Sequence, residues 1–207
     1  MTGYLDLQAL VQIIGPRFAE GAAERDAGDI FVADHYDVLT QHKVFSALVP
    51  REFGGGGVAY SAMCRFLREL AHYCPSTALA LSMHQHLVAA AVYNHRQGRP
   101  GRKLLERVAA SELVLISTGA ADWMESNGLA QRANGGFRVN ARKPFGSGSP
   151  KGGLLMTSAP FEDPDEGWQV LHFAVPFDAP GVSLGDDWQT LGMRATGSQT
   201  IVLENVF

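Results

Sequence analysis

Two hydrophobic periods divide this chain, and their order constrains its fold more than any other feature of the sequence. In the first part, apolar residues such as Leu7, Leu10, Val11 and Ile14 recur at three- and four-residue steps, which is typical of amphipathic helices. Past Glu112, short apolar and β-branched runs alternate with clusters of Gly, Asn, Asp and Pro, which is typical of antiparallel strands. Helices that precede strands, instead of alternating with them, argue against Rossmann and TIM-barrel architectures.

We therefore predict an α+β chain with an all-α helical domain over residues 1–111 and an antiparallel β-barrel-like domain over residues 112–207. In the second domain, the Asn-Gly pair of residues 134–137 predicts a hairpin turn, because this pair accepts the positive φ angles of tight turns. Strands are expected in the runs LVLIST, GFRVNAR, GLLMTSA, QVLHFAV and QTIVLENV.

The helical part is expected to contain helices over residues 33–43 and 61–73, followed by a long apolar helix. Ser76 fits the N-cap of that long helix, and Gly98 fits its end. Pro100 then fits the first turn of another helix, because proline is favoured at that position.

Composition narrows the class of protein. Hydrophobic residues make up 46% of the chain and charged residues 18%, which is the composition of a globular protein with a sizeable core. The net charge of −4 argues against a nucleic-acid or anionic-membrane partner. The longest apolar stretch is interrupted by His84 and His86, and the N-terminus shows no leader pattern. A cytoplasmic protein is expected.

Four consecutive glycines, Gly54 to Gly57, raise the question of a phosphate-binding loop. Such loops follow a strand and open a helix, whereas this run follows a helix-like segment and no Lys-Ser/Thr pair comes after it. We therefore predict a turn between helices that needs positive φ angles.

Histidines and cysteines give no metal site. His84 and His86 are two residues apart on a predicted helix and point to different faces, so neither is expected to share a metal ion with the other. Cys64 and Cys74 match no zinc or redox spacing, and both are expected to be buried small hydrophobic residues.

The segment ARKPFGSGSPKGG, residues 141–153, is the candidate binding loop. Its backbone amides and the hydroxyls of Ser147 and Ser149 suit a polar planar ring, and Phe145 is placed to stack on the ring's face. An ordinary connection between strands explains the same residues, and the residues alone leave the two readings open.

The order of four motifs resembles the acyl-CoA dehydrogenase family. The PREFGGGG turn is similar to the family's "P-E-x-(Y/F)-G-G-x-G", and ELA at residues 69–71 is similar to the helix that follows it. GFRVNARKPFGSG resembles the family's strand and flavin-facing segment, and PGVSLGDDWQTLGMRATGS resembles its "PGV…LGMRGTGS". The resemblance covers nearly the whole chain.

This resemblance implies a homo-oligomeric flavoprotein that holds FAD between the β domain and a further helical domain. Thr118, Phe145 and Ser147 match the family's cofactor-binding positions: the family's threonine contacts the flavin ring through its backbone and hydroxyl. The implied activity is oxidation of the α,β C–C bond of an acyl-CoA thioester, in which the flavin accepts a hydride.

The chain departs from the family in three places. The family's "T-E-P-x-x-G-S-D" becomes TGAADWME, so the acidic residue after Thr118 is absent. Lys151-Gly152-Gly153 replaces an alanine-rich turn, and the chain stops at Phe207, before the helical domain that carries the family's catalytic glutamate. We therefore expect a truncated portion that lacks the catalytic base.

Two alternatives remain at this stage. A reduced-flavin-dependent monooxygenase of the same fold, using FMN and acting on an aromatic or heterocyclic substrate, suits the altered TGAADWME segment. A non-catalytic remnant or scaffold would bind no flavin. In each enzyme reading the partner is a small molecule, acyl-CoA or another substrate.

Overall fold

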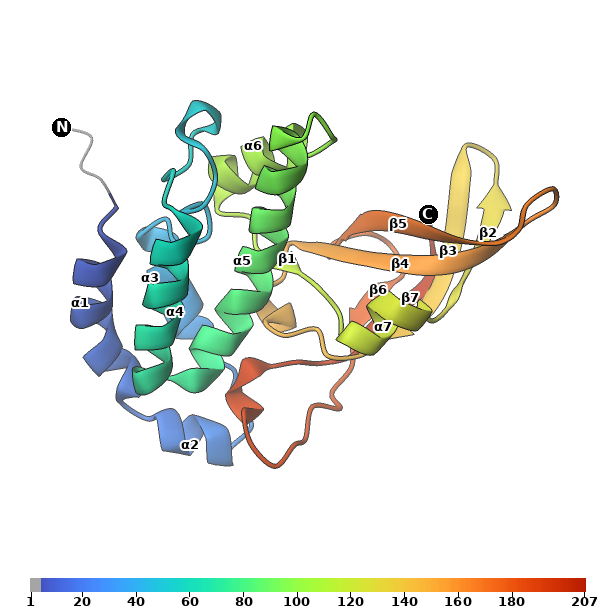
Figure 1. The fold of residues 1–207 in the computed structure, drawn as a ribbon. Coiled ribbons are helices and arrows are strands. Elements are labelled where there is room, and N and C mark those ends of the chain that lie inside the picture. The colour runs from blue at the N-terminus through green and yellow to red at the C-terminus, as the bar shows by residue number, and fades with distance from the viewer. Residues whose placement is uncertain (1–4) are drawn as a thin grey trace.

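The computed structural model describes residues 5–207, so the first residues of the stretch examined for a leader lie outside it. Apart from the short helix of residues 120–125, which lies beside the strands, helices occupy one end of an elongated molecule and strands the other (Figure 1). The described helices are α1 (Leu7–Ala19), α2 (Ala22–Ala27), α3 (Ala33–Gln41), α4 (Tyr60–Tyr73), α5 (Pro75–Arg96), α6 (Arg102–Ser111) and α7 (Ala120–Glu125), with short 3₁₀ turns at Arg51–Phe53, Ser149–Lys151 and Arg194–Thr196.

The strands form two sheets. One has the order β1-β4-β5 and the other β2-β3-β7-β6, and β1 pairs with β4 in parallel while the other pairs are antiparallel. The sheets do not close, so the expected barrel-like domain is an open pair of sheets. The strands are β1 (Leu115–Ile116), β2 (Leu129–Ala133), β3 (Gly136–Lys143), β4 (Leu154–Asp163), β5 (Gly167–Pro176), β6 (Val182–Leu184) and β7 (Ile201–Val206).

The predicted hairpin and helices are present with shifted ends. Asn134 and Gly135 join β2 to β3, and Gly135 has φ +85°. Ser76 is not the N-cap of α5: Cys74 holds that position and Pro75 begins the helix, because a proline lacks the N–H that this position leaves unpaired. Cys64 is exposed, contrary to prediction, whereas Cys74 is buried.

The glycine run is a turn in which every backbone N–H group is already hydrogen-bonded. The N–H groups of Gly54, Gly55, Gly56 and Gly57 donate to main-chain carbonyls of residues 46–51. Gly54 and Gly57 have positive φ angles of 87° and 62°, as a turn of this kind requires. Because all four N–H groups are engaged, this loop offers no amide to a phosphate, and the prediction of a turn is confirmed.

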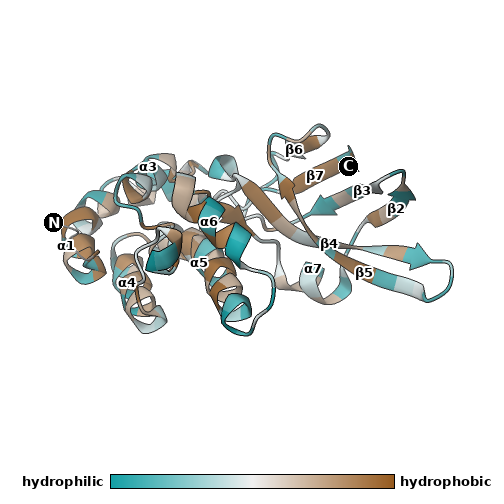
Figure 2. Ribbon diagram, turned by 90° about the horizontal axis from the view of Figure 1, so that it is seen from above, coloured by the Kyte–Doolittle hydropathy of each residue, from teal (hydrophilic) through white to brown (hydrophobic). Residues whose placement is uncertain are grey.

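One apolar core runs through both halves of the molecule, and buried side chains of α1, α3, α4 and α5 join those of β1, β4 and β7 in it. Hydrophobic and hydrophilic residues alternate along the helices and strands (Figure 2). None of the helices in residues 5–207 combines the length and the apolar character that a bilayer crossing demands.

His84 connects the helical part to the first strand. Its Nδ1 accepts a hydrogen bond from the backbone N–H of Leu115 at 2.9 Å, so the ring proton is on Nε2, which donates to the Phe45 carbonyl at 2.8 Å. Burial lowers the pKa of His84 to about 4, against the weaker effect of the Phe45 hydrogen bond. The neutral ring is therefore part of the joint between α5 and β1.

The buried ammonium group of Lys143 joins the two sheets. Lys143 lies at the end of β3, and its Nζ donates to Asp122 Oδ1 at 2.7 Å and to the carbonyls of Asn127 and Ser158 at 2.6 Å each. These three bonds satisfy all three hydrogens of the ammonium group. Burial lowers the pKa of Lys143, while the hydrogen bond and charge of Asp122 raise it.

Acid should weaken the protein through His84. Its pKa is about 4 in the folded protein and about 6.5 when unfolded, so below pH 6.5 the unfolded chain binds the extra proton first. The contribution of His84 to the free energy of unfolding is fully present above pH 6.5. It is lost as the pH drops toward 4, by up to about 3 kcal/mol. His35, whose pKa burial also lowers to about 4, adds a similar slope.

Chemical denaturation across pH 4 to 7.5 measures this effect. The slope of unfolding free energy against pH reports the protons taken up on unfolding, and His84→Gln should reduce that number by about one. Ala90→Gln, an exposed change on the same helix, should keep the wild-type slope. An unchanged slope in His84→Gln would contradict the assignment.

Breaking the Lys143–Asp122 pair should be costly. Lys143→Met leaves the Asp122 carboxylate buried without its counter-ion, which costs about 3–5 kcal/mol of unfolding free energy. Adding Asp122→Asn should recover part of this loss. Arg102→Ala is the matched control, because it breaks an exposed pair of the same 2.7 Å length and should cost less than about 1 kcal/mol. Equal losses in Lys143→Met and Arg102→Ala would refute the role of burial.

Candidate functional site

The candidate loop between β3 and β4 is held against the segment that precedes β7. The N–H groups of Gly146 and Gly148 donate to the carbonyls of Gln199 and Thr196 at 3.1 and 2.9 Å. Ser149 Oγ donates to the Gly197 carbonyl at 3.1 Å. The loop of residues 144–149, which we call the Phe145 loop, is therefore fixed by partners about fifty residues further along the chain.

Phe145 presents an exposed aromatic face. Its ring is 55% exposed, and its backbone has φ +61°, a left-handed conformation that is unfavourable for a bulky residue. The Gly119 N–H supports this conformation by donating to the Pro144 carbonyl at 3.2 Å. A flat apolar surface held in a strained backbone conformation is an observation that points toward a binding function.

Ser147 ends a row of buried hydroxyl groups. Its Oγ is 2.8 Å from Ser198 Oγ, and Ser198 Oγ is 2.7 Å from Thr196 Oγ1. Thr196 Oγ1 in turn donates to the Met193 carbonyl at 2.8 Å. Ser147 was predicted from the sequence, but Ser198 and Thr196 were not, because their only signal is their place in the GMRATGS motif.

Thr118 lies one helical turn before Asp122, and its hydroxyl faces the interior. Thr118 Oγ1 donates to Asp122 Oδ2 at 2.6 Å, and the side chain is buried. The other oxygen of Asp122 accepts from Lys143, so the carboxylate and its partners form one buried network. A flavin contact through Thr118 remains a prediction.

The missing acidic residue after Thr118 has a steric explanation. Gly119 stands in that place, and a Cβ there would lie 3.1 Å from the Phe145 ring. A glutamate at residue 119 would press on that ring, so glycine and the exposed phenylalanine fit together.

Two buried polar atoms near the Phe145 loop have no partner within residues 5–207. They are Trp188 Nε1, whose ring meets Phe145 edge-on at 5.8 Å, and Ser117 Oγ, next to Thr118. Buried groups without partners are rare in proteins and often mark places where a ligand or water completes the structure.

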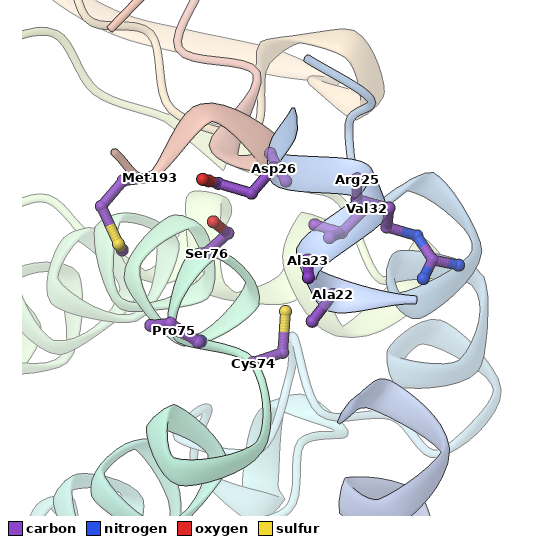
Figure 3. Close-up of a pocket in the computed structure, with 10 residues that line it drawn as sticks. Ala22, Ala23, Arg25, Asp26, Val32, Cys74, Pro75, Ser76 and Met193 are labelled. Carbon is purple, nitrogen blue, oxygen red and sulfur yellow. The ribbon is translucent and has the colours of Figure 1, made fainter. Parts of the chain in front are cut away.

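Three cavities lie elsewhere in the described structure. One of about 290 Å³ lies between α2, the start of α5 and residues 193–195, with Asp26, Ser76 and Met193 around it (Figure 3). A second, also about 290 Å³, opens between the sheets at Phe137 and Phe207, and the third, about 910 Å³, borders the glycine turn. None of these cavities is lined by Thr118, Phe145 or Ser147.

The first cavity borders a joint that the sequence did not reveal. Arg194 makes two hydrogen bonds of 2.7 Å each to the carboxylate of Asp29, and its backbone N–H donates to Asp26. The Asp29 hydrogen bond raises the pKa of Arg194. This pair holds the 3₁₀ turn after β6 against α2, so Arg194 has a structural role.

Residues 5–207 contain no group of three or more potential metal ligands. The residues of the Phe145 loop fit a flavin ring instead. Phe145 offers a flat face and Ser147 Oγ a polar edge contact, while Trp188 supplies an unpartnered donor beside them. These are the groups by which a protein orients such a ring and tunes its chemistry.

Curated relatives match most of this chain. The chain is 26% identical over 198 residues to a protein named "Probable FMNH2-dependent monooxygenase SfnC" from Pseudomonas putida, covering 96% of this chain and 49% of the relative. It is 31% identical to the amino sugar nitrososynthase RubN8 from Streptomyces rubradiris, covering 92% and 46%. It is 25% identical to an isovaleryl-CoA dehydrogenase from Oryza sativa subsp. japonica, covering 91% and 48%. The chain thus spans about half the length of these relatives.

Solved structures superimpose on nearly the whole of this chain and on about half of their own length. KijD3 in complex with FMN and a dTDP-amino-keto sugar matches all of this chain and 53% of its own, with a TM-score of 0.87 and 28% identity. XiaF from Streptomyces sp., in complex with FADH2 and glycerol, matches 96% of this chain and 48% of its own, with a TM-score of 0.78 and 29% identity. Both neighbours therefore bind a flavin.

Two domain models of one family match the two parts of the chain. The model of the acyl-CoA dehydrogenase N-terminal domain matches residues 8–112, and that of the middle domain matches residues 117–206. With the fold, the motif order and these matches in agreement, the chain belongs to the acyl-CoA dehydrogenase family.

Proposed function

We propose that this chain is part of an enzyme that uses reduced flavin and O₂ to oxygenate a small substrate. Similarity to an FMNH2-dependent monooxygenase and to nitrososynthases supports this activity over the acyl-CoA oxidation that the motifs first suggested. This activity is the alternative that the altered TGAADWME segment indicates.

The observation that carries the proposal is the pair of bulky residues on α7. Where acyl-CoA dehydrogenases have a small Gly-Ser pair, this chain has Trp123 and Met124, and Met124 is almost fully exposed. Trp123 stacks on His172 of β5 with ring centroids 5.6 Å apart. Large apolar side chains at this point suit an aromatic or otherwise apolar substrate better than the phosphate groups of a CoA thioester.

Reduced flavin and O₂ together account for all the atoms and electrons of the proposed reaction. Bound reduced flavin supplies two electrons, so that one atom of O₂ enters the substrate and the other leaves as water. The chain's own residues position the ring through Phe145 and Ser147. The buried Asp122 network holds the Thr118 backbone beside them. Either FMN or FAD provides the same ring, and the experiment below distinguishes them.

Acyl-CoA dehydrogenation is the second candidate, because the chain also resembles an isovaleryl-CoA dehydrogenase. That reaction needs a carboxylate base to take the α proton. None of the glutamates in this chain matches the family's base, so the base would lie outside residues 1–207. We also propose a homo-oligomer, because the family resemblance implies one.

Anaerobic titration of the full-length protein with reduced FMN and, separately, with FADH2 tests the function. We expect saturable binding of a reduced flavin, followed by O₂ consumption when air is admitted. A panel of acyl-CoA thioesters should leave the bound oxidised flavin coloured. Bleaching of the flavin by a thioester alone would establish the dehydrogenase, and absence of flavin binding in either redox state would leave the scaffold reading.

Replacing the exposed ring of Phe145 should weaken flavin binding without unfolding the protein. Phe145→Leu keeps an apolar side chain but loses the aromatic face, which is worth about 1 kcal/mol or a fivefold rise in Kd. Trp168→Leu is the control, since Trp168 is similarly exposed on β5 and lies outside the Phe145 loop. Equal flavin affinities in the two variants would exclude Phe145 as a stacking surface.

A further inference from the structure

We propose that the cavity between α2, the start of α5 and residues 193–195 binds a small, uncharged aromatic molecule that carries a hydroxyl group, such as a phenol. This cavity is separate from the Phe145 loop, because none of Thr118, Phe145 and Ser147 lines it. It is therefore a second site, whether or not the loop binds a flavin. Its walls combine a buried hydroxyl without a partner, a carboxylate with a free oxygen, and an apolar surface.

Ser76 supplies the buried hydroxyl. It does not cap α5, since Cys74 holds the N-cap position and the helix has no side-chain cap. Ser76 is 5% exposed and lines the cavity, yet its Oγ makes no hydrogen bond within residues 5–207. Because a buried polar group normally has a partner, this hydroxyl indicates one that the described part of the chain does not provide.

Asp26 supplies the second polar group. Its Oδ1 accepts the backbone N–H of Arg194 at 2.9 Å, whereas its Oδ2 has no hydrogen bond from any described residue. The Asp26 carboxylate and the Ser76 hydroxyl are turned toward the same part of the cavity (Figure 3). A ligand hydroxyl between them donates to the carboxylate and accepts from Ser76, so it satisfies both groups at once.

The charges around the cavity favour an uncharged ligand. The Asp26 carboxylate repels an anion, and the guanidinium groups of Arg25 and Arg194 repel a cation. Both guanidinium groups are already paired, Arg25 with Asp34 at 2.9 Å and Arg194 with Asp29 at 2.7 Å. A neutral hydroxyl meets the polar pair without bringing a like charge against any of these groups.

The rest of the cavity suits an aromatic ring. Cys74 and Met193 line it from different elements (Figure 3). Sulfur atoms of cysteine and methionine are polarisable, and thioethers in particular pack favourably against aromatic rings. The other apolar residues of the lining are small or medium in size: Ala22, Ala23, Val32, Pro75 and Ala195.

The volume of the cavity limits the size of the ligand. It is about 290 Å³, whereas an apolar cavity of roughly 150 Å³ is enough to hold benzene. One ring with a hydroxyl group therefore fits, and the remaining space admits a second ring or a short side chain.

A ligand-observed NMR titration of the full-length protein without flavin tests the site, with phenol as the probe. We expect saturable binding of phenol that is about fivefold tighter than that of toluene, which has the same shape but no hydroxyl. Benzoate and benzylammonium carry a charge and should bind more weakly than phenol.

Substitutions in the lining separate the polar groups from the available space. Ser76→Ala should weaken phenol binding about fivefold and leave toluene binding unchanged, because it removes one hydrogen bond between neutral groups. Asp26→Asn keeps an acceptor for the Arg194 N–H but loses the charge, so it should also weaken phenol binding. Ala23→Met fills the cavity and should abolish the binding of both probes. Ala27→Met is its control, because Ala27 belongs to the same helix but does not line the cavity.

Methionine labelled with ¹³C at its methyl group locates the bound probe. The Met193 signal, identified by its loss in Met193→Leu, should shift when phenol is added, because an aromatic ring changes the magnetic field at a methyl group beside it. Met63 and Met156 do not line the cavity, and their signals should stay in place.

Phenol that fails to bind, binds no better than toluene, or leaves the Met193 signal unmoved would overturn the site. Wild-type affinity for phenol in Ser76→Ala would overturn it as well. Thermal unfolding of each variant confirms that the protein tested is folded. Because no flavin is present, these outcomes are distinct from those that test the proposed function.

Discussion

The ammonium group of Lys143 lies where both sheets and α7 meet, and the candidate site depends on how this charge is accommodated. Nζ bonds to a carboxylate on α7 and to two main-chain carbonyls, one after α7 and one on β4. Asp122 completes the network by accepting from Thr118 and, at 3.2 Å, from the Asn127 N–H. A buried ion pair contributes less to net stability than to a single geometry, and here that geometry places the segment of Thr118 beside the Phe145 loop.

The sequence predicted the helical part well, because periodicity reports directly on burial. It failed where local rules competed: Ser76 looked like an N-cap, but Pro75 is better suited to begin the helix. It missed α7, since six residues are too few to show a helical period. Lys143 was read only as part of a motif, because nothing in a sequence distinguishes a buried lysine from the many exposed ones.

Only the part of the site that is local in sequence was predicted. Phe145 and Ser147 are neighbours in sequence and could be found together. Their supports, such as Ser198 and Trp188, come from a segment some fifty residues away, and only the pairing of β3 with β7 brings them close. Family resemblance supplied the cofactor class. The substitution of bulky residues on α7 and the relatives then favoured oxygenation over dehydrogenation.

We propose that the Phe145 loop of this chain binds a reduced flavin. The most direct measurement is a crystal structure of the full-length protein grown anaerobically with reduced flavin. We expect ring density against Phe145, with Ser147 Oγ within hydrogen-bond distance of the ring. Flavin density elsewhere, with the Phe145 ring still exposed to solvent, would contradict it.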